Sequence, residues 1–318
     1  MTARDPNPVR LLGDLPTEFV GTTARHRKAL ATAFGTLAPT RLRPRARIEF
    51  APGALDLPTR DPDEDVGGQL GWRDGDTYTV ECWGLTARVA GGDATIRGDG
   101  PDLARRLAWI GQPVLADLLS PFERPLLHAA AIERDGIALL VMGASGRGKS
   151  TTTFAAHRSG WRILGDDHVV LRRSEDGAET PVEICGIPKP VAVPGELADG
   201  IPAGARRMTR DARERWQLPA TVLGAGWHPL AGTLWLDHAK SALGYTEPAN
   251  ALELLRELVA SHPAAGSHEA LTRLMPLAST VARGPAWRLR LGADPATRVA
   301  DAGRLLDTIA SASDTRVA

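Results

Sequence analysis

The chain has 318 residues, of which 43% are hydrophobic and 24% are charged, and its formal net charge is zero. This composition is typical of a soluble globular protein with roughly two domains. The balance of charge excludes nucleic-acid binding through a whole-surface field, and no run approaches the ~18 apolar residues that span a bilayer. We therefore expect neither a nucleic acid nor a membrane as a partner.

The cysteines and the N-terminus indicate a cytoplasmic location. Cys82 and Cys185 lie far apart and form no paired motif, which excludes a disulfide framework and a cysteine-based zinc site as organising features. Residues 1–10 are polar and lack the apolar core of a secretory signal. We expect both cysteines to be thiols in a reducing compartment.

The first hundred residues predict a β-rich N-terminal domain, residues 1–100. Residues 1–65 are punctuated by prolines and are expected to be irregular, apart from a short helix at 25–34. Apolar and polar residues then alternate between turn signals over 69–97, which indicates an antiparallel meander. Apolar residues at helical spacing over 101–119 predict a connecting helix, residues 101–120, that Pro113 kinks or breaks.

The remainder of the chain alternates between predicted strands and helices. Apolar runs at 126–133 and 137–142 flank Asp135-Gly136, and Asp-Gly between such runs is a strong hairpin signal. A helix is expected from Lys149 to about Arg158, closed by Gly160. Further strands are expected at 162–164, 169–172, 182–185 and 233–236, and further helices at 249–261, 268–277 and 295–311.

Residues 143–150 read Gly-Ala-Ser-Gly-Arg-Gly-Lys-Ser and fit the phosphate-binding pattern G-x-x-x-x-G-K-[ST]. The required strand before it and helix after it are both predicted. The glycines let successive N–H groups point at phosphate oxygens, while the helix start adds the positive end of a dipole. We expect Lys149 to reach the β- and γ-phosphates and the Ser150 hydroxyl to bind Mg²⁺, with ATP as the nucleotide. The predicted nucleotide site comprises Gly143, Ala144, Ser145, Gly146, Arg147, Gly148, Lys149, Ser150 and Thr151.

Two adjacent carboxylates, Asp166 and Asp167, follow the strand predicted at 162–164. Beside a nucleotide, one carboxylate can orient Mg²⁺ while the other accepts the proton of an attacking hydroxyl. His128 lies on the first strand of the predicted hairpin, where a lone histidine is more often a core residue. A lone strand glutamate such as Glu183 is more often a solvent-facing charge, so these two need further support.

The segment 127–171 resembles the HPr kinase/phosphorylase superfamily. It carries Leu127-His128, the hairpin, the phosphate loop and Gly165-Asp166-Asp167-His168-Val169 in the order L-H-(G/A), G-x-S-G-x-G-K-S and D-D-x-V. The superfamily includes HPr kinases, free-serine kinases and the serine kinases encoded beside lasso-peptide biosynthesis genes, and the organisation of this chain is closest to the last group. The resemblance implies an α/β fold, with an HPr kinase/PEP carboxykinase-like P-loop domain at 121–318 behind a smaller β-rich domain.

The same resemblance implies a kinase that uses ATP and Mg²⁺ to phosphorylate a hydroxyl, expected to be a serine of a peptide such as a ribosomal natural-product precursor. In the family, the histidine and the first aspartate are associated with proton handling, and the second aspartate and a downstream glutamate with the metal. These roles make His128 and Asp166 catalytic together with Lys149, and add Asp167 and Glu183 to Ser150 as metal ligands.

Two other functions stay open from the sequence. The first is a kinase for free serine or another small hydroxylated metabolite. The second is a regulatory protein that binds a nucleotide without transferring phosphate, although the presence of both aspartates and His128 disfavours it. The sequence leaves the oligomeric state undecided, with a homo-oligomer among the options.

A group of basic residues after the phosphate loop is a candidate substrate site. Five arginines lie within residues 206–215, either as a solvated helix face or as a clamp for a γ-phosphate or an acidic substrate. Residues 234–237, Leu-Trp-Leu-Asp, superficially resemble a second metal-binding strand, but no acidic residue follows Asp237 and we predict no role for it. The candidate substrate-binding residues are Lys189, which is one of only four lysines, and Arg206, Arg207 and Arg210.

Overall fold

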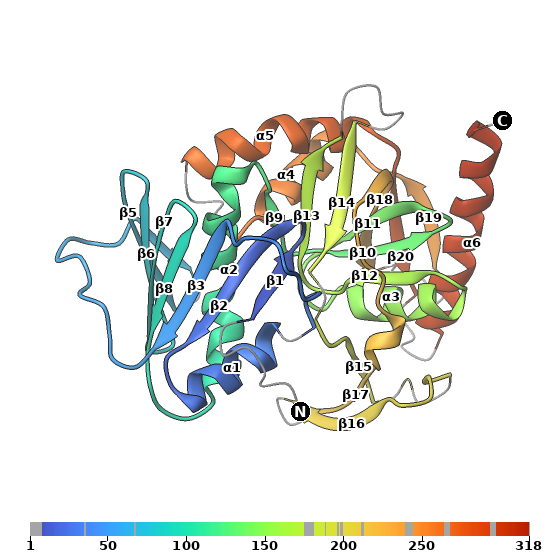
Figure 1. The fold of residues 1–318 in the computed structure, drawn as a ribbon. Coiled ribbons are helices and arrows are strands. Elements are labelled where there is room, and N and C mark those ends of the chain that lie inside the picture. The colour runs from blue at the N-terminus through green and yellow to red at the C-terminus, as the bar shows by residue number, and fades with distance from the viewer. Residues whose placement is uncertain are drawn as a thin grey trace. The chain divides into compact units, whose positions relative to one another are not determined.

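The structure is a computed structural model with a mixed α/β fold (Figure 1). It divides into two compact units, Met1–Leu126 with His262–Leu274 and Leu127–Ser261 with Met275–Ala318. The residues that the structure describes are 8–34, 36–66, 68–174, 181–187, 189–195, 197, 200–210, 213–238, 244–263, 268–292 and 297–317.

An eight-stranded sheet forms the body of the first unit, in the order β1-β2-β3-β8-β7-β6-β5-β4. Strands β5 to β8 pair antiparallel with their neighbours in sequence, which confirms the meander predicted over 69–97. The β2–β3 and β3–β8 pairs are parallel. The strands are β1 (Val9–Leu12), β2 (Leu15–Gly21), β3 (Ala46–Ala51), β4 (Glu64–Val66), β5 (Gln69–Asp74), β6 (Thr77–Cys82), β7 (Leu85–Ala90) and β8 (Asp93–Arg97).

The expectation that residues 1–65 are irregular is wrong. Strands β1, β2 and β3 lie within this range and β4 begins in it, and the expected helix, α1 (Ala24–Phe34), lies there as well. Pro8 and Pro44 come before β1 and β3, and Pro52 follows β3, so these prolines bound the strands rather than disrupt them. These strands are short, and their buried and exposed residues do not alternate regularly. The sequence therefore lacks the apolar–polar alternation that predicts a strand.

Helix α2 (Leu103–Leu119) packs against β6 and β7 through an apolar face. Leu107, Ile110 and Leu118 on this face are completely buried. The helix continues through Pro113, so of the kink or break expected there, the break does not occur. Burial of the apolar face compensates for the proline, which costs about 3 kcal/mol in a helix interior.

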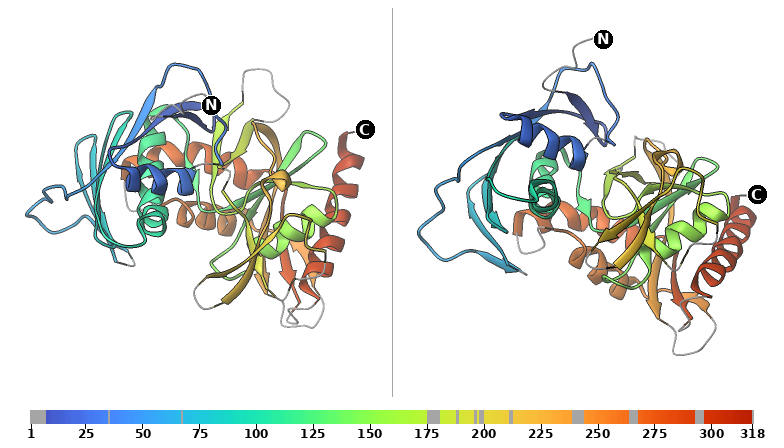
Figure 2. Two further views of the ribbon diagram at one scale, coloured as in Figure 1. Left: turned by 60° about the horizontal axis from the view of Figure 1, so that its bottom comes forward. Right: turned by 90° about the horizontal axis from the view of Figure 1, so that it is seen from below.

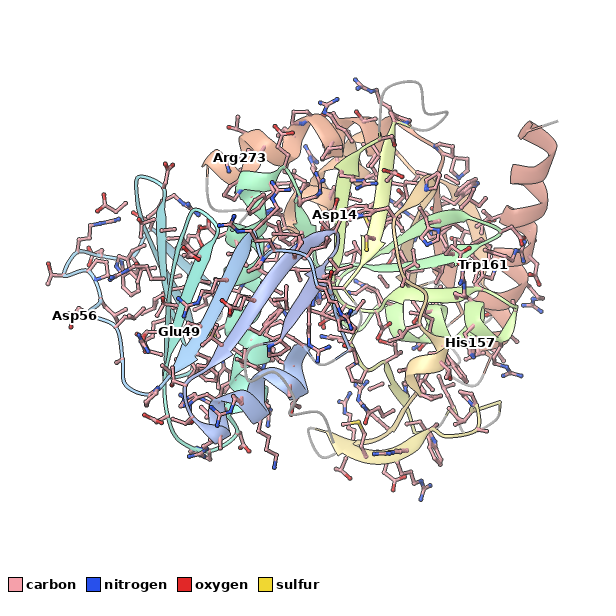
Figure 3. All side chains as sticks on the ribbon, viewed as in Figure 1. Asp14, Glu49, Asp56, His157, Trp161 and Arg273 are labelled. Carbon is pink, nitrogen blue, oxygen red and sulfur yellow. The ribbon has the colours of Figure 1, made fainter. Side chains whose placement is uncertain are left out.

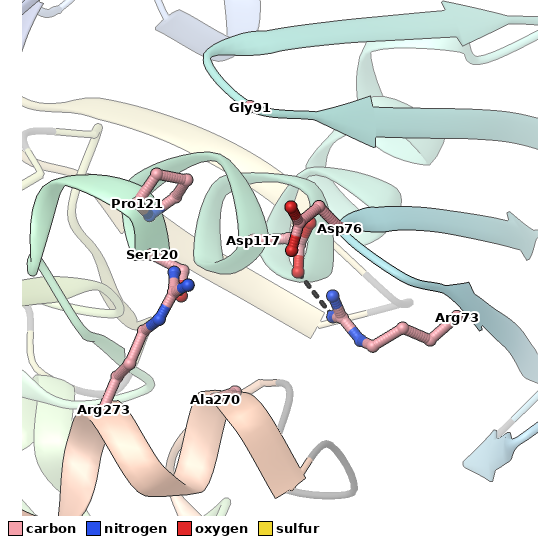
Figure 4. Close-up of a pocket in the computed structure, with 8 residues that line it drawn as sticks. All are labelled: Arg73, Asp76, Gly91, Asp117, Ser120, Pro121, Ala270 and Arg273. Atoms are coloured by element: carbon pink, nitrogen blue, oxygen red, sulfur yellow. Dashed lines mark hydrogen bonds and ion pairs between the residues drawn. The ribbon is translucent and has the colours of Figure 1, made fainter.

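A small hollow of about 190 Å³ lies at the C-terminal end of α2 (Figure 4). Arg73 donates a hydrogen bond from Nη2 to Oδ1 of the nearly buried Asp117. Arg273 donates from Nη1 to Ser120 Oγ at 2.9 Å, where Ser120 begins the short 3₁₀ helix η1 (Ser120–Phe122). These two contacts connect β5 and the segment 262–274 to the end of α2 within the first unit. We therefore assign the residues that line this hollow a structural role.

A nine-stranded sheet is the main sheet of the second unit. Its path is β12-β10-β11-β18-β14-β13-β9, and β20 pairs with both β18 and β19. Strands β10 and β11 form the predicted hairpin, with Asp135 and Gly136 both at positive φ as a type I′ turn requires. The strands are β9 (Leu126–Leu127), β10 (Ala130–Arg134), β11 (Ile137–Met142), β12 (Arg162–Gly165), β13 (Val169–Arg173), β14 (Val182–Gly186), β18 (His228–His238), β19 (Tyr245–Pro248) and β20 (Ala286–Leu291).

Helices cover this sheet near the places that the sequence predicts. The α3 and α6 helices contact each other, and their buried residues join a core that includes Trp161 (Figure 3). Among the described residues, no helix is long and apolar enough to cross a membrane. The helices are α3 (Lys149–Arg158), α4 (Ala251–Ala260), α5 (His268–Arg283), α6 (Arg298–Val317) and the 3₁₀ helix η2 (Ala220–Val222).

The arginine-rich segment forms part of a separate three-stranded sheet (Figures 1 and 2). Strands β16 (Arg206–Arg210) and β17 (Arg213–Gln217) make an antiparallel hairpin, and β15 (Ala192–Pro194) pairs with β17. Val193 on β15 is completely buried in the core that also contains Phe154 of α3. The alternative of a solvated helix face is therefore wrong.

Candidate functional site

The phosphate-loop motif connects β11 to α3, as the sequence predicts. Gly143, Gly146 and Gly148 all adopt positive φ, a conformation that glycine adopts without steric cost. A Cβ atom on Gly143 would lie only 2.9 Å from the carbonyl oxygen of Leu236 on β18. The loop therefore needs glycine both for its backbone conformation and for close contact with the neighbouring strand.

The ammonium group of Lys149 is held inside the loop. Its Nζ donates a hydrogen bond to Gly143 O at 2.7 Å, and only 9% of the residue is exposed. Burial lowers the pKa of Lys149, against the opposing effect of the nearby negative charges of Asp167 and Asp166. The position provides a compact, poorly hydrated cation of the kind that binds phosphate oxygens strongly.

Asp166 is bound to the first turn of α3. Its Oδ2 accepts a hydrogen bond from Ser150 Oγ at 2.9 Å, and its Oδ1 accepts one from Thr153 Oγ1 at 2.8 Å. Desolvation raises the pKa of Asp166 to about 6, although the two hydroxyls favour the ionised form. Both carboxylate oxygens are thus already engaged on the helix, and Asp166 fixes the orientation of the Ser150 hydroxyl.

Asp167 lies at the centre of a second group of side chains, which we name the Asp167 cluster: His128, Asp167, His168 and Lys189. His128 Nδ1 lies 3.2 Å from Asp167 Oδ1, His168 Nδ1 lies 3.6 Å from Oδ2, and Lys189 Nζ forms an ion pair with Oδ2. Burial opposes ionisation of Asp167, but the electrostatic effects of His168, Lys189 and His128 together outweigh it and keep the pKa of Asp167 well below its ordinary value.

Both histidines of the Asp167 cluster favour the neutral form. Burial lowers the pKa of His168 to about 3, and burial together with the charges of Lys149 and Lys189 lowers the pKa of His128. A neutral imidazole is able to accept a proton. The side chain of His128 is 35% exposed and that of Asp167 24%, so a substrate hydroxyl is able to approach both.

The cluster is assembled from three chain segments. His128 lies between β9 and β10, and its backbone N–H donates to Ser261 O at 2.7 Å. Asp167 lies between β12 and β13, and Lys189 follows β14. The sequence-based roles group His128 with Asp166, whereas the structure places His128 against Asp167.

The possible metal ligands fall into two groups of different chemistry. Ser150 and Asp166 offer oxygen donors, which fit Mg²⁺. One ligand atom from each of His128, Asp167 and His168 lies within 4.8 Å of the others. Imidazole nitrogens suit softer metals, and the Lys189 ammonium beside Asp167 opposes a second cation there. The residues therefore fit Mg²⁺ beside Ser150 and fit proton handling in the Asp167 cluster.

Glu183, which the family resemblance adds to the metal ligands, lies elsewhere. It is on β14, and its Oε2 accepts a hydrogen bond from Arg172 Nε at 2.7 Å. The Arg172–Glu183 pair is three residues along the β13–β14 ladder from the Val169–Gly186 pair, roughly 10 Å at the rise of a strand. The described hydrogen bond of Glu183 is thus with Arg172, and its role as a metal ligand stays a prediction.

The four candidate substrate-binding residues lie in two different places. Lys189 joins the Asp167 cluster, whereas Arg206, Arg207 and Arg210 lie on β16. Arg207 pairs with Glu214 at 3.6 Å and lies over the ring of Trp216 at 5.3 Å. Only the backbone of Arg210 is within the described part of the chain.

Asp237, for which the sequence predicts no role, contacts the phosphate loop. Met142 pairs with Trp235 in the parallel β11–β18 ladder, which places Asp237 beside the start of the phosphate loop. Its Oδ1 lies 3.3 Å from Arg147 Nη1, and its Oδ2 accepts a hydrogen bond from Arg290 Nη1 at 3.3 Å. The apolar run ending in an aspartate was the available signal, and Asp237 anchors the loop through Arg147.

Substitution of Lys189 by methionine is expected to raise the pKa of His128. The positive charge of Lys189 disfavours a second charge on the imidazole, so its removal makes protonation easier. A pH titration of the imidazole signals by NMR measures the change. The exposed Lys28 of α1 provides the matched control, because Lys28→Met should leave this titration unaltered. A lowered or unchanged pKa in Lys189→Met would contradict the electrostatic assignment.

Comparisons with known proteins show similarity to HPr kinases. No family model matches the chain. The HPr kinase/phosphorylase of Clostridium botulinum (strain Eklund 17B / Type B) is 41% identical over 61 residues, 19% of each chain. The HPr kinase/phosphorylase of Peptoclostridium acidaminophilum is 39% identical over 62 residues, 20% of each chain. The matched segment thus spans about a fifth of these curated relatives.

A solved structure, the Hpr(Ser) kinase/phosphatase from Coxiella burnetii, is matched over 60% of this chain and 97% of its own, with 10% identity and a TM-score of 0.31. The comparison rests on the curated relatives, because their sequences are about 40% identical to this chain within the matched segment. They confirm the resemblance of this chain to the HPr kinase-like superfamily.

Proposed function

We propose that this chain is a kinase that uses ATP and Mg²⁺ to phosphorylate a serine hydroxyl. The main support for the proposal is that two adjacent aspartates beside one phosphate loop have different contacts. Asp166 holds the Ser150 hydroxyl, and Asp167 pairs with His128. A nucleotide-binding protein without catalysis would need the first arrangement but not the second.

The loop and its helix supply the groups that bind the phosphates. Backbone N–H groups of the loop would bind phosphate oxygens, and Lys149 would provide the cation for the β- and γ-phosphates. Ser150 would hold Mg²⁺, which neutralises charge on these phosphates when bound. Asp166 keeps the Ser150 hydroxyl oriented and supplies a balancing negative charge. Asp237 steadies the loop from the other side through Arg147.

The Asp167 cluster supplies the groups that handle the acceptor. Asp167 accepts a hydrogen bond from the acceptor hydroxyl and aims its oxygen at the γ-phosphorus. The new O–P bond forms as the bond to the β–γ bridging oxygen breaks, and the hydroxyl proton passes to Asp167 or to neutral His128. Because the transition state is loose, positioning matters more than the strength of the base. This assignment exchanges the roles that the family resemblance gives to Asp166 and Asp167.

We infer that the acceptor serine belongs to a peptide, such as a ribosomal precursor peptide. The partial exposure of His128, Asp167 and Lys189 supports this, because a side chain of a larger substrate is able to reach them. The resemblance of residues 127–171 to lasso-peptide-associated kinases supports it as well. Free serine is the competing acceptor, and it enters the experiment as a second substrate.

The test is incubation of the full chain with ATP, Mg²⁺ and either a serine-containing precursor peptide or free serine, followed by mass spectrometry. We expect the peptide to gain one phosphate and ADP to accumulate in equal amount. Lys149→Met is the control that removes the phosphate-binding cation and should prevent the gain. Phosphorylation of free serine alone would contradict the peptide assignment. Binding of ATP without transfer to either acceptor would contradict the kinase.

A further inference from the structure

Two exposed tryptophans stack on each other at one end of the eight-stranded sheet of the first unit. Trp83 is 60% exposed and Trp109 is 46% exposed, and their ring centroids lie 6.1 Å apart with an angle of 20° between the ring planes. Trp83 lies in the turn between β6 and β7, and Trp109 lies on α2. Single exposed apolar side chains are ordinary, whereas adjoining ones mark interaction sites.

The backbone at Trp83 has an unfavourable conformation. Its φ is 54°, and Gly84 follows with a φ of 70°. A two-residue hairpin turn of this kind ordinarily has asparagine, aspartate or glycine at its first position, because bulky side chains are strained at positive φ. Burial does not offset this cost, because most of the Trp83 side chain is exposed. Strain of this kind is typical of positions that bind a ligand or a partner.

Arg106 holds the turn in place beside α2. Its Nε donates to Trp83 O at 2.7 Å, and its Nη1 donates to Asp99 O at 2.6 Å. A Cβ atom on Gly84 would lie 2.9 Å from Arg106 Nη2, so glycine makes room for the guanidinium group. Trp109 follows Arg106 by three residues and therefore lies on the same side of the helix. The two rings are thus arranged before any partner binds.

The start of α1 adds basic side chains at the same end of the sheet. His26 Nε2 lies 2.9 Å from Gly98 O, in the loop that Arg106 also contacts. Arg25 and Lys28, in the same turn of α1, are exposed. Among the described residues, neither these two side chains nor Arg106 forms an ion pair with a carboxylate. The basic residues of the segments 22–28 and 98–109 are Arg25, Arg27, Lys28, Arg105 and Arg106, and the acidic ones are Asp99 and Asp102.

We propose that this surface binds an acidic segment of the acceptor peptide, and we name it the tryptophan surface: Trp83, Trp109, Arg25, Lys28 and Arg106. The inference rests on the proposed function, in which the acceptor is a peptide. The indole faces pack against an aromatic or proline side chain, and the indole N–H groups donate to peptide carbonyls. The cations pair with carboxylates. One stacked pair favours a peptide over a single-stranded nucleic acid, whose successive bases need a row of aromatic side chains.

Fluorescence anisotropy of the full chain with a labelled synthetic peptide tests the proposal. The probe carries a serine preceded by glutamates around one tryptophan, and the comparison peptide has glutamine and alanine at these positions. We expect Trp83→Asn and Trp109→Ala each to weaken binding of the probe about five- to thirtyfold. Both variants should fold, because asparagine tolerates positive φ and alanine favours a helix. Leu252→Ala removes an exposed apolar side chain from α4 and is the matched control.

The basic part of the tryptophan surface is tested by reversing a charge. Arg25→Glu should weaken binding of the probe about three- to tenfold, and added salt should reduce this difference because the side chain is exposed. Binding of the comparison peptide should not change. Arg41→Glu is the matched control, because Arg41 is an exposed arginine in the segment before β3. Equal weakening in Arg25→Glu and Arg41→Glu would show that net charge, and not this surface, attracts the peptide.

The outcomes separate this inference from the proposed function. If the wild-type chain phosphorylates the probe, Trp83→Asn should raise its KM and leave kcat and ATP binding unchanged. Unchanged probe affinity in both tryptophan variants would overturn the tryptophan surface and leave the kinase assignment intact. Selective loss of the probe in variants of a chain that phosphorylates no acceptor would support peptide binding here and refute the kinase.

Two results with the wild-type chain would also overturn the tryptophan surface. The first is equal affinity for the probe and the comparison peptide, because neither the carboxylates nor the ring would then contribute. The second is tighter binding of an oligothymidylate than of the probe, because the partner would then be a nucleic acid. Circular dichroism and thermal melting verify that each variant is folded.

Discussion

Asp167→Asn is expected to lower phosphotransfer by about 10²–10⁴-fold, because it removes the carboxylate that orients the acceptor hydroxyl and receives its proton. Asn has nearly the same size, so the neighbouring groups keep their places. Binding of ATP with Mg²⁺ should stay within about threefold of wild type, because Asp167 contacts Lys189 and His128 rather than Ser150. Single-turnover kinetics and calorimetry measure the two quantities separately.

Asp166→Asn is the matched comparison, one residue away. It removes the negative charge behind the Ser150 hydroxyl, so we expect the Mg²⁺ concentration needed for half-maximal ATP binding to rise about 10–100-fold. Phosphotransfer should fall in this variant as well. If Asp167→Asn instead weakened the metal dependence and Asp166→Asn left it unchanged, the roles implied by the family resemblance would be restored and ours refuted.

Asp166→Asn is also expected to stabilise the protein in the absence of metal and nucleotide at pH 8. Burial raises the pKa of Asp166 to about 6, against an ordinary value of 3.8, so the folded state opposes ionisation of this carboxyl. This difference corresponds to about 3 kcal/mol of unfolding free energy at a pH above both values. Asn removes the buried charge, keeps one acceptor oxygen for one of the two hydroxyls, and presents its NH2 group to the other hydroxyl, which is able to accept.

The sign of the effect fixes its pH dependence. A folded-state pKa above the unfolded value contributes stability below pH 3.8, and this contribution is lost as the pH rises through about 6. The advantage of Asp166→Asn should therefore be small near pH 4, grow between pH 4 and 7, and stay constant above. Urea unfolding of both proteins at pH 4.5 and 8 measures it. An advantage that is equal at both pH values would show that Asp166 does not titrate as proposed.

These two results together would identify Asp166 as a residue that costs stability and is needed for metal binding. Such a conflict between stability and activity is common at catalytic sites, where charged groups are desolvated in advance of the substrate. The neighbouring Asp167 differs, because His168, Lys189 and His128 together outweigh the effect of its burial. Two adjacent aspartates thus have opposite pKa shifts, and this difference suits them to different tasks.

Local sequence determined the elements that carry strong short-range signals. The Asp135-Gly136 turn, the phosphate loop and the helix after it depend on residues adjacent in the chain, and the structure has all three. The α/β class follows from the alternation of strand and helix patterns. The sequence did not predict strands β1 to β4. A short strand between prolines is stabilised by partners from distant positions in the chain, as Phe19 of β2 is by Ile48 of β3.

Only the tertiary structure decided which side chains meet. Residue types and spacing marked His128, Asp166, Asp167 and Lys189 as candidates, but backbone direction after β12 decided which carboxylate faces Ser150 and which faces His128. Asp237 reaches the loop through the parallel pairing of β18 with β11, across more than ninety residues of chain. A sequence pattern fixes the chemistry that each residue offers, whereas long-range strand pairing and burial decide its partners and its pKa.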